Sequence, residues 1–501
     1  MASNKQQVEF GDFQTPLPLA IEVCQTLARL GVQPAAAIEP TCGRGAFVAA
    51  SLQSFPNLRQ AVGLDRNASH LAAARRSIKA ASFMKRDFFT ANWQRIIRDL
   101  PQPLLVIGNP PWVTNTQLSR LDSSNVPLKS NQGMRGMDAI TGRSNFDISE
   151  WMILRMIDWL EGTPGSLAML CKTKVARRVL EQAWQSSRNV GRCSIYTIDA
   201  AKHFQVAVDA CLLLCELGKR NSSTAAVYSN LQSKRPQSQI GLSEVGRSNN
   251  GDRVYKLVSD LRLYKTTTAY ARNHTNASTN SNSQWTWRSG IKHDCSSVME
   301  LLSDGQSLRS QAGRALDLEP RYLFPFLKGS QVASGQVQPT RRVIVTQRNT
   351  GDDTKTIAHT APQTWKYLLQ HGEQLDARRS SIYKNRPRFS VFGIGDYTFT
   401  QWKVAIAGLY KKLEFRVVGP YRRKPVLFDD TTYFLPCPAR EIAEEIVGIL
   451  HSDPVQQFFR SQIFWDEKRP ITSDLLNRLD LASLLKVQSP QQTRSRSKKA
   501  K

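Results

Sequence analysis

Residues 35–65, AAAIEPTCGRGAFVAASLQSFPNLRQAVGLD, decide the fold that the sequence predicts. An apolar run over residues 35–38 is followed by a turn that contains Gly43 and Gly45, and a helix is expected to begin near Ala46. A second apolar run, residues 61–64, ends in Asp65. Two short apolar runs joined by a helical stretch are typical of a βαβ unit, in which a crossover helix connects parallel strands.

The same alternation extends outward from this stretch to residue 217. Apolar positions recur at helical spacing over residues 17–30, 68–79, 147–161 and 175–184. Further short runs predict strands at residues 82–85, 103–107, 166–170, 194–198 and 210–216. We therefore predict an α/β domain over residues 1–217: a Rossmann-like, mostly parallel sheet with helices on both faces.

The composition changes after Leu217. Residues 218–297 are polar and rich in Ser and Asn, which predicts a linker or a loop-rich segment. Order is expected to return over residues 298–487, as a mixed, β-rich domain with a helical end near 439–485. The basic stretch 488–501 is expected to be a disordered tail.

The charge balance indicates the kind of partner. Lys and Arg number 68 against 41 Asp and Glu, a formal net charge of +27. A surplus of this size most often marks a partner with many phosphates, although charge that serves only solubility is the alternative. The sequence has no apolar run of about 18 residues that would span a membrane. Eight Cys without a C-x-x-C pair fit a reducing cytoplasm and predict neither a disulfide framework nor a metal site.

The glycine turn after the first predicted strand is a candidate ligand site. Gly43 and Gly45 allow a tight turn and a close approach of the backbone to a ligand. Asp65, at the end of the next strand, could accept hydrogen bonds from both hydroxyls of an adenosine ribose. A tight turn without a ligand is the alternative. A dinucleotide is disfavoured because Val48 occupies the place of the third glycine in G-x-G-x-x-G.

A second motif, Asn109-Pro110-Pro111-Trp112, ends the apolar run LLVIG. Two prolines fix φ twice and make the loop rigid. The side-chain oxygen of Asn109 and the carbonyl of Pro110 could accept both N–H bonds of an exocyclic amine, and Trp112 could stack on its base. A proline-rich turn with a buried Trp is the alternative.

Together the two motifs resemble the adenine-N6 DNA methyltransferases of type II restriction–modification systems, in the group with the gamma motif order. The resemblance covers residues 8–217 motif by motif and residues 300–440 more loosely. It implies the class I fold, S-adenosyl-L-methionine as cofactor, and duplex DNA as substrate with the target adenine flipped out. It also implies a separately encoded restriction endonuclease as a possible partner.

The resemblance assigns roles to residues that match the family's motifs. The catalytic residues would be Asn109, Pro110, Trp112 and Phe204, the last stacking on the extruded base. The cofactor-binding residues would be Thr15, Glu39, Cys42, Gly43, Gly45, Asp65, Asp87, Phe88 and Asn109. The family's tetrad often ends in Tyr where this chain has Trp112. His70 and His203 are expected to be structural or to face phosphate.

Two basic segments are candidates for holding DNA. The Gly-rich loop over residues 113–145 carries Lys129, Arg135 and Arg143, although a plain solvent loop is equally compatible. Residues 376–426 contain twelve Lys and Arg against three acidic residues, and a merely charged face is the alternative. The expected phosphate contacts there are Arg378, Arg379, Lys384, Arg386 and Arg388. Gly393 and Gly395 predict a bent or bulged strand, and most nearby aromatics are expected in the core.

Other reactions remain open from the residues alone. Asn-Pro-Pro-aromatic tetrads also occur in enzymes that methylate guanine N2 in RNA or a glutamine amide in protein. Methylation of cytosine N4 is possible on chemical grounds. A non-catalytic DNA-binding subunit with the same fold is a further alternative, which the intact Asn109 and Asp65 disfavour.

Overall fold

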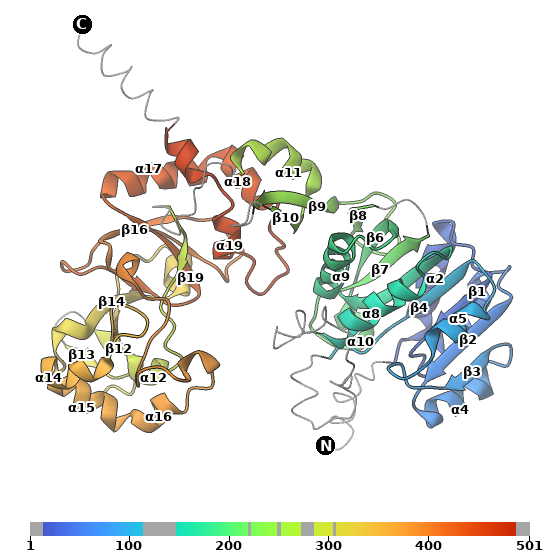
Figure 1. The fold of residues 1–501 in the computed structure, drawn as a ribbon, viewed down its shortest axis with the longest axis horizontal. Helices are drawn as coiled ribbons and strands as arrows, with labels where there is room; N and C mark the ends of the chain where they lie inside the picture. Colours follow the sequence, from blue (N-terminus) through green and yellow to red (C-terminus); the bar gives the residue numbers. More distant parts are fainter. Residues whose placement is uncertain are drawn as a thin grey trace, which may run out of the picture. The chain divides into compact units, whose positions relative to one another are not determined.

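The computed structural model describes residues 14–113, 147–218, 222–247, 252–271, 285–303 and 307–486. The chain divides into two compact units (Figure 1). Unit 1 contains Met1–Ser243 and Tyr255–Leu261, and unit 2 contains Glu244–Val254 and Arg262–Lys501.

The main sheet has ten strands in the order β10-β9-β8-β6-β7-β5-β4-β1-β2-β3. Strands β3, β2, β1, β4 and β5 run parallel, and β7 lies antiparallel between β5 and β6. Their bounds are β1 (Ala36–Glu39), β2 (Gln60–Asp65), β3 (Ser82–Lys85), β4 (Leu104–Gly108), β5 (Gly165–Lys172), β6 (Val190–Ile198) and β7 (Ala210–Leu217).

Helices cover the sheet of unit 1 and explain why its central strands lack polar alternation. Leu19 and Val23 of α2 (Leu17–Arg29) and Phe47 of α3 (Ala46–Ser54) pack against Leu105 and Ile107 of β4. All five residues of β4 are buried, as expected for a strand covered on both faces. The remaining helices are α4 (Ala68–Ser77), α5 (Trp93–Arg98), α8 (Ile148–Trp159), α9 (Thr173–Gln185) and α10 (Ala200–Phe204).

The predicted elements of this region are confirmed to within a few residues. The seven strands and five helices expected before residue 217 all form. The short helices α5 and α10 were not predicted, because neither is long enough to show a clear apolar period.

The segment expected to be a polar linker contains regular structure instead. Strands β8 (Thr224–Tyr228), β9 (Ser238–Arg247) and β10 (Arg253–Val258) extend the main sheet, and helix α11 (Leu261–Thr267) follows. Strand β8 pairs with β6 in parallel and with β9 antiparallel. A ladder of backbone hydrogen bonds does not require apolar side chains, and a polar strand near a sheet edge therefore escapes a search for apolar runs.

Unit 2 contains two smaller sheets. The five-stranded sheet has the order β13-β12-β15-β14-β18, and the four-stranded sheet has the order β11-β19-β16-β17. The strands are β11 (Arg288–Ser289), β12 (Glu300–Ser303), β13 (Leu308–Arg309), β14 (Leu323–Leu327), β15 (Arg341–Ile344), β16 (Trp402–Ala407), β17 (Arg416–Val418), β18 (Leu427–Phe428) and β19 (Thr432–Cys437). This agrees with the expected mixed, β-rich region.

Helices accompany the two sheets and end the unit. Short helices α12 (Ser296–Met299), α13 (Gly329–Ala333), α14 (Ile357–Thr360), α15 (Pro362–Gln370) and α16 (Gly372–Asp376) lie between strands. The helical end predicted near residues 439–485 is confirmed by α17 (Arg440–His451), α18 (Asp453–Arg460) and α19 (Ser473–Leu476).

The bent strand expected at Gly393 and Gly395 does not form. Residues 381–399 contain two 3₁₀ turns, Ser381–Tyr383 and Asp396–Phe399, joined by irregular backbone. Gly393 has φ +70°, and a Cβ there would lie 2.5 Å from the carbonyl oxygen of Gly290. The glycine thus permits a close backbone approach rather than a strand bulge, while Phe389 is fully buried in the core as expected for most aromatics here.

Candidate functional site

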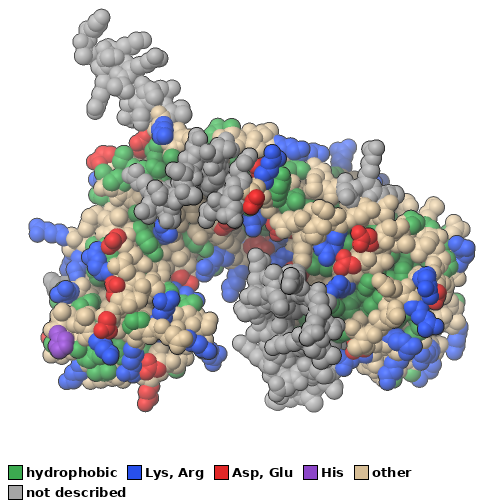
Figure 2. Space-filling model, viewed as in Figure 1, with side chains coloured by type: hydrophobic (Ala, Val, Ile, Leu, Met, Phe, Trp, Pro, Cys, Tyr) green, Lys and Arg blue, Asp and Glu red, His purple; other side chains and the backbone are tan. Residues whose placement is uncertain are grey.

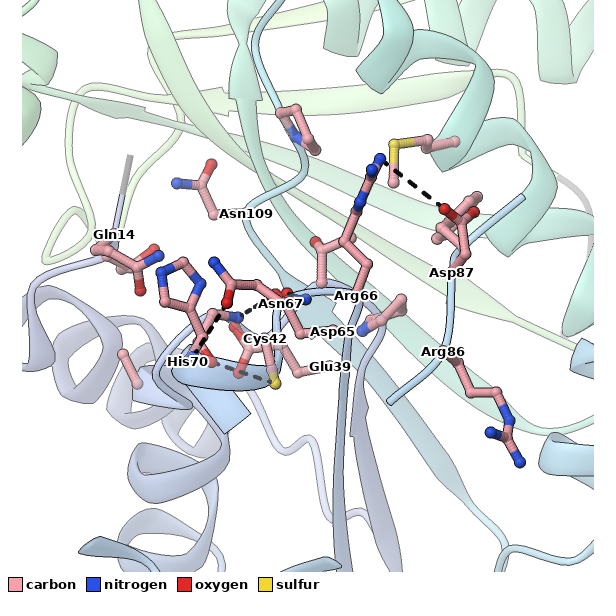
Figure 3. Close-up of a pocket in the computed structure, with 18 of the residues that line it drawn as sticks. Gln14, Glu39, Cys42, Asp65, Arg66, Asn67, His70, Arg86, Asp87 and Asn109 are labelled. Atoms are coloured by element: carbon pink, nitrogen blue, oxygen red, sulfur yellow. Dashed lines mark hydrogen bonds and ion pairs between the residues drawn. The ribbon is translucent and has the colours of Figure 1, made fainter. Parts of the chain in front are cut away.

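A pocket of about 320 Å³ opens where the parallel strands of unit 1 end. Residues that follow β1, β2, β3 and β4 all reach it, because the carboxyl ends of parallel strands meet at one edge. Figure 3 shows Gln14, His70 and Asn109 on one side and Arg66 with Asp87 on the other. The predicted residues that line the pocket are Thr15, Glu39, Cys42, Gly43, Asp65, Asp87, Phe88 and Asn109.

The glycine turn adopts a conformation that other residues rarely take. Gly43 and Gly45 have φ of +51° and +81°, and a Cβ on Gly43 would collide with the side chain of Gln14. The amide of Gly43 donates to Asp65 Oδ2 at 2.8 Å, and Asn67 N donates to Asp65 Oδ1 at 2.7 Å. Asp65 therefore joins the turn to the end of β2, and its carboxylate keeps further lone pairs for a ligand.

Glu39 lies at the end of β1, below the turn. Its side chain is 3% exposed, and Oε2 accepts a hydrogen bond from Val48 N at 3.2 Å. Burial raises the pKa of Glu39 well above its usual range, with a further rise from Asp65 and an opposing effect of the Val48 amide. Glu39 thus stabilises the first turn of α3 as well as lining the pocket.

Asp87 and Phe88 follow β3 at the far side of the pocket. Asp87 Oδ1 accepts from Phe89 N at 2.8 Å, and Arg66 lies 4.0 Å from Oδ2. The ring of Phe88 is buried against Trp93 and Trp159, with centroid separations of 5.3 and 5.2 Å. This aromatic cluster fixes the backbone next to Asp87.

The four residues of the tetrad after β4, Asn109 to Trp112, differ in their surroundings. Asn109 and Pro111 line the pocket, whereas Trp112 is buried and its Nε1 donates to Leu170 O at 3.3 Å. Trp112 and Phe204 contact each other edge to face, with centroids 5.2 Å apart. The structure brings the two predicted stacking residues together, but each ring packs in the core rather than presenting an open face.

Comparisons with known proteins identify the family of the chain. The chain is 43% identical over 491 residues to the "Type II methyltransferase M.NspV" of Nostoc sp. (strain ATCC 29411 / PCC 7524), covering 96% of this chain and 98% of the relative. The chain belongs to the type II methyltransferase family. No family model matches the sequence.

One solved structure supports the fold. The type IIL restriction–modification enzyme MmeI in complex with DNA aligns with a TM-score of 0.50 at 12% identity, over 95% of this chain and 67% of that one. The type IIG restriction endonuclease BpuSI aligns with a TM-score of 0.34 at 12% identity, over 94% of this chain and 58% of that one. Unit 1 has the Rossmann-like fold of class I S-adenosylmethionine-dependent methyltransferases, and β-rich sheets follow it.

A lysine of the methyltransferase fixes the backbone of the tetrad. Lys172, at the end of β5, donates to Trp112 O at 3.0 Å and to Asp147 Oδ2 at 2.7 Å. Asp147 is buried and also caps α8 by accepting from Ser149 N. Because Ile148 N donates to Val113 O at 3.0 Å, the two chain ends that flank residues 114–146 are held together beside the pocket.

Several pocket residues of the methyltransferase were not predicted as ligands. Most of them lie within a few residues of a predicted site residue in the sequence. The others come from the start of α8. They are Gln14, Arg66, Asn67, His70, Arg86, Phe89, Ile148 and Met152. Proximity to Asp65 and Asp87 at strand ends is the signal that could have found most of them.

Cys42 lies in the pocket but is unsuited to nucleophilic chemistry. Its thiol is buried, and burial followed by the nearby Glu39 and Asp65 raises its pKa far above the usual range. The thiol therefore stays protonated near neutral pH. This agrees with the sequence interpretation of Cys42 as a small lining residue.

The predicted DNA contacts have different surroundings. Lys129, Arg135 and Arg143 lie outside the described residues. Arg379, Lys384 and Arg386 are exposed. Figure 2 shows many Lys and Arg side chains on the face in view, with fewer Asp and Glu among them.

Arg378 and Arg388 are engaged within the protein. Arg378 is half-buried, donates to the carbonyls of Leu375, His293 and Ser390, and stacks 3.8 Å from the centroid of Tyr383. Arg388 forms a two-pronged ion pair with Asp376, at 2.7 Å for the shortest contact. These contacts favour a structural role for Arg378, in contrast to the phosphate contact expected from its charge.

Among the described residues, no helix has the length and apolar character needed to cross a membrane.

Proposed function

We propose that the protein is a site-specific DNA methyltransferase that acts on the N6 amino group of adenine in duplex DNA. The observation that carries the proposal is that Asp65, Asp87 and Asn109 line one pocket although they lie at or just beyond the ends of three different strands. The family supports methyl transfer, and the net charge of +27 supports a polyanionic substrate.

The pocket suits S-adenosyl-L-methionine as the methyl donor. Its volume is in the range of small-molecule sites, and the lack of a Cβ on Gly43 lets the side chain of Gln14 lie directly against the glycine turn. Asp65 would accept from the ribose hydroxyls, Asp87 from the adenine amino group, and the region of Glu39 would hold the methionine end. The bound cofactor supplies an electrophilic methyl group on a sulfonium.

Asn109 would orient the nucleophile. Its side-chain oxygen and the Pro110 carbonyl would accept the two N–H bonds of the target amine, which turns the nitrogen lone pair toward the methyl group. An N–C bond forms as the S–C bond breaks, and the nitrogen then releases one proton to water. Catalysis would depend on positioning and on the exclusion of water rather than on a general base.

The target base must leave the duplex to reach such a pocket. The edge-to-face pair of Trp112 and Phe204 lies next to the tetrad, and separation of the two rings would open a slot for a flat base. The protein would act in the cytoplasm and protect host DNA from a separately encoded restriction endonuclease.

Mass spectrometry of nucleosides from methylated DNA tests the proposal. Purified protein, labelled cofactor and duplex DNA should yield N6-methyladenine, and Asn109→Ala should lower the rate at least about 1000-fold while duplex binding stays unchanged. Arg98→Ala, at an exposed position of α5, is the control.

Other products would overturn specific parts of the proposal. N4-methylcytosine would refute the base, and transfer to RNA or protein alone would refute the DNA substrate. Full activity of Asn109→Ala would refute the catalytic assignment. Sequencing of host DNA with modified-base detection, with and without the gene, would then give the recognition sequence.

A further inference from the structure

The turn between β17 and β18 has an unusual backbone. Tyr421 N donates to Lys424 O at 2.9 Å and Lys424 N donates to Tyr421 O at 3.1 Å, which closes a two-residue hairpin turn. Arg422 and Arg423, its two central residues, both have left-handed φ, +51° and +65°. Such turns normally carry Asn-Gly, because residues with a longer side chain are strained in this conformation.

Two arginines therefore make this turn less stable than Asn-Gly would, and they add two positive charges to it. Strained backbone that the surrounding structure maintains is often found at binding sites. Here the strained turn places two adjacent, exposed arginines at its tip.

Further cations surround the turn. Arg342 of β15 and Arg422 lie 6.0 and 5.6 Å from the ring centroid of Tyr421. Burial, and then repulsion from Arg422, lowers the pKa of Arg342. Burial, and then repulsion from Arg342, lowers the pKa of Lys424. Like charges are thus held close together, an arrangement that an anion would relieve.

Lys424 fixes the position of the turn that carries Arg422 and Arg423. Lys424 Nζ donates to Leu323 O at 2.9 Å and also to Pro320 O, which attaches the turn to the start of β14. Within the described part of the chain, neither Arg342 nor Arg423 forms an ion pair with a carboxylate. Their guanidinium groups are therefore available to an external anion in a preorganised position.

We propose that the Tyr421–Lys424 turn is a phosphate-binding element, through which Arg342, Arg422 and Arg423 contact the backbone of duplex DNA. The planar guanidinium fork matches a phosphate diester, and a rigid array loses little entropy on binding. The inference rests on the proposed DNA substrate and adds contacts outside residues 378–388. It assigns positioning of the duplex, not reading of its bases.

The double variant Arg422→Asn with Arg423→Gly provides a sharp test. It installs the residues that such a turn prefers, so the protein should fold with an equal or higher Tm. Duplex affinity should nevertheless fall on the order of tenfold at 0.1 M salt. The slope of log K against log salt should shrink by about 1.8, the value for two lost phosphate contacts. Fluorescence anisotropy with a labelled duplex, repeated over a salt series, measures both quantities.

A matched control removes the same charge elsewhere in unit 2. Lys411 and Lys412 are adjacent and exposed, so Lys411→Asn with Lys412→Gly lowers the net charge equally. An equal loss of affinity in this control would overturn the inference, since general charge would then explain the effect. Arg342→Gln should reduce the salt slope by about 0.9 on its own.

The outcomes separate this inference from the proposed function. A wild-type protein that binds no duplex would refute the DNA substrate itself. A wild-type protein that binds and methylates DNA, together with an Asn-Gly variant of unchanged affinity and salt slope, would refute only the phosphate-binding turn.

Discussion

The pocket of unit 1 and the basic segment 376–426 of unit 2 differ in what places their residues. In the pocket, Asp65, Asp87 and Asn109 meet because each lies at or just beyond the end of a parallel strand, and the sheet brings these strand ends to one edge. In the basic segment no such rule applies, and neighbours in sequence have unlike surroundings. Arg378 is enclosed by backbone carbonyls, while Arg386 is exposed. The order of strands in the sequence therefore predicts where the pocket residues lie, whereas the charge of a residue does not predict its surroundings.

Among the variants that test this comparison, Asp65→Ala should have the largest effect, and it tests the role of the strand ends. Asp65→Ala removes the proposed acceptor for two ribose hydroxyls and releases the Gly43 amide, so cofactor affinity should fall about 100-fold or more. Isothermal titration with S-adenosyl-L-methionine measures it. Asp99→Ala, at an exposed site, should bind like the wild type. Unchanged affinity of Asp65→Ala would remove the pocket as the cofactor site.

Arg378 and Arg386 test the second half directly. Arg378→Ala leaves three carbonyls without their donor and should lower the free energy of unfolding by roughly 2–3 kcal/mol. Arg386→Ala should leave stability within about 0.5 kcal/mol and instead reduce the salt slope of duplex binding by about 1. Urea denaturation and a salt titration on both variants give the comparison. Similar behaviour of the two arginines would erase the distinction drawn between them.

The pH dependence of stability at Lys403 gives a second test of whether a basic residue of this segment is structural or available to DNA. It belongs to the basic segment, yet it is 1% exposed, and Nζ donates to Thr400 O at 2.7 Å and Val426 O at 2.9 Å. Burial lowers its pKa to about 7. Above pH 7 the unfolded chain binds more protons at this lysine than the folded one, so this contribution to stability rises with pH up to about 10.

The size of that rise can be measured by difference. The free energy of unfolding of the wild type, relative to Lys403→Met, should increase by about 2 kcal/mol between pH 7 and pH 9. Denaturation of both proteins at the two pH values subtracts the titration of all other groups. A difference that does not change with pH would mean that Lys403 remains charged in the folded protein.

Lys172 should give the smallest effect and tests whether the pocket depends on more than its lining. Lys172→Met removes the donor to Trp112 O and the partner of Asp147, so the tetrad loses its support. As a positioning residue, Lys172 should affect kcat, lowering it about tenfold, and leave the cofactor Kd unchanged. Lys172→Arg should restore part of kcat. A parallel loss of cofactor binding would point to a general structural defect.

The sequence predicted the fold of unit 1 and its pocket better than any other part. Apolar runs ending in Glu39, Asp65 and Gly108 identify strands, and residues beyond strand ends must face the ligand edge. The rest depended on tertiary contacts. Polar strands β8 and β9 are held by backbone ladders, the Trp112–Phe204 contact requires the folded core, and Lys172 acts on a residue 60 positions away.

The bond between Ile148 N and Val113 O has a consequence for changes in chain length. Together with Lys172, which contacts both Trp112 and Asp147, this bond joins the end of the tetrad to the start of α8 without involving residues 114–146. Closing a longer connection costs only about 0.6 kcal/mol for each doubling of its length. Insertions or deletions between Val113 and Ile148 should therefore leave the sheet of unit 1 and its pocket in place.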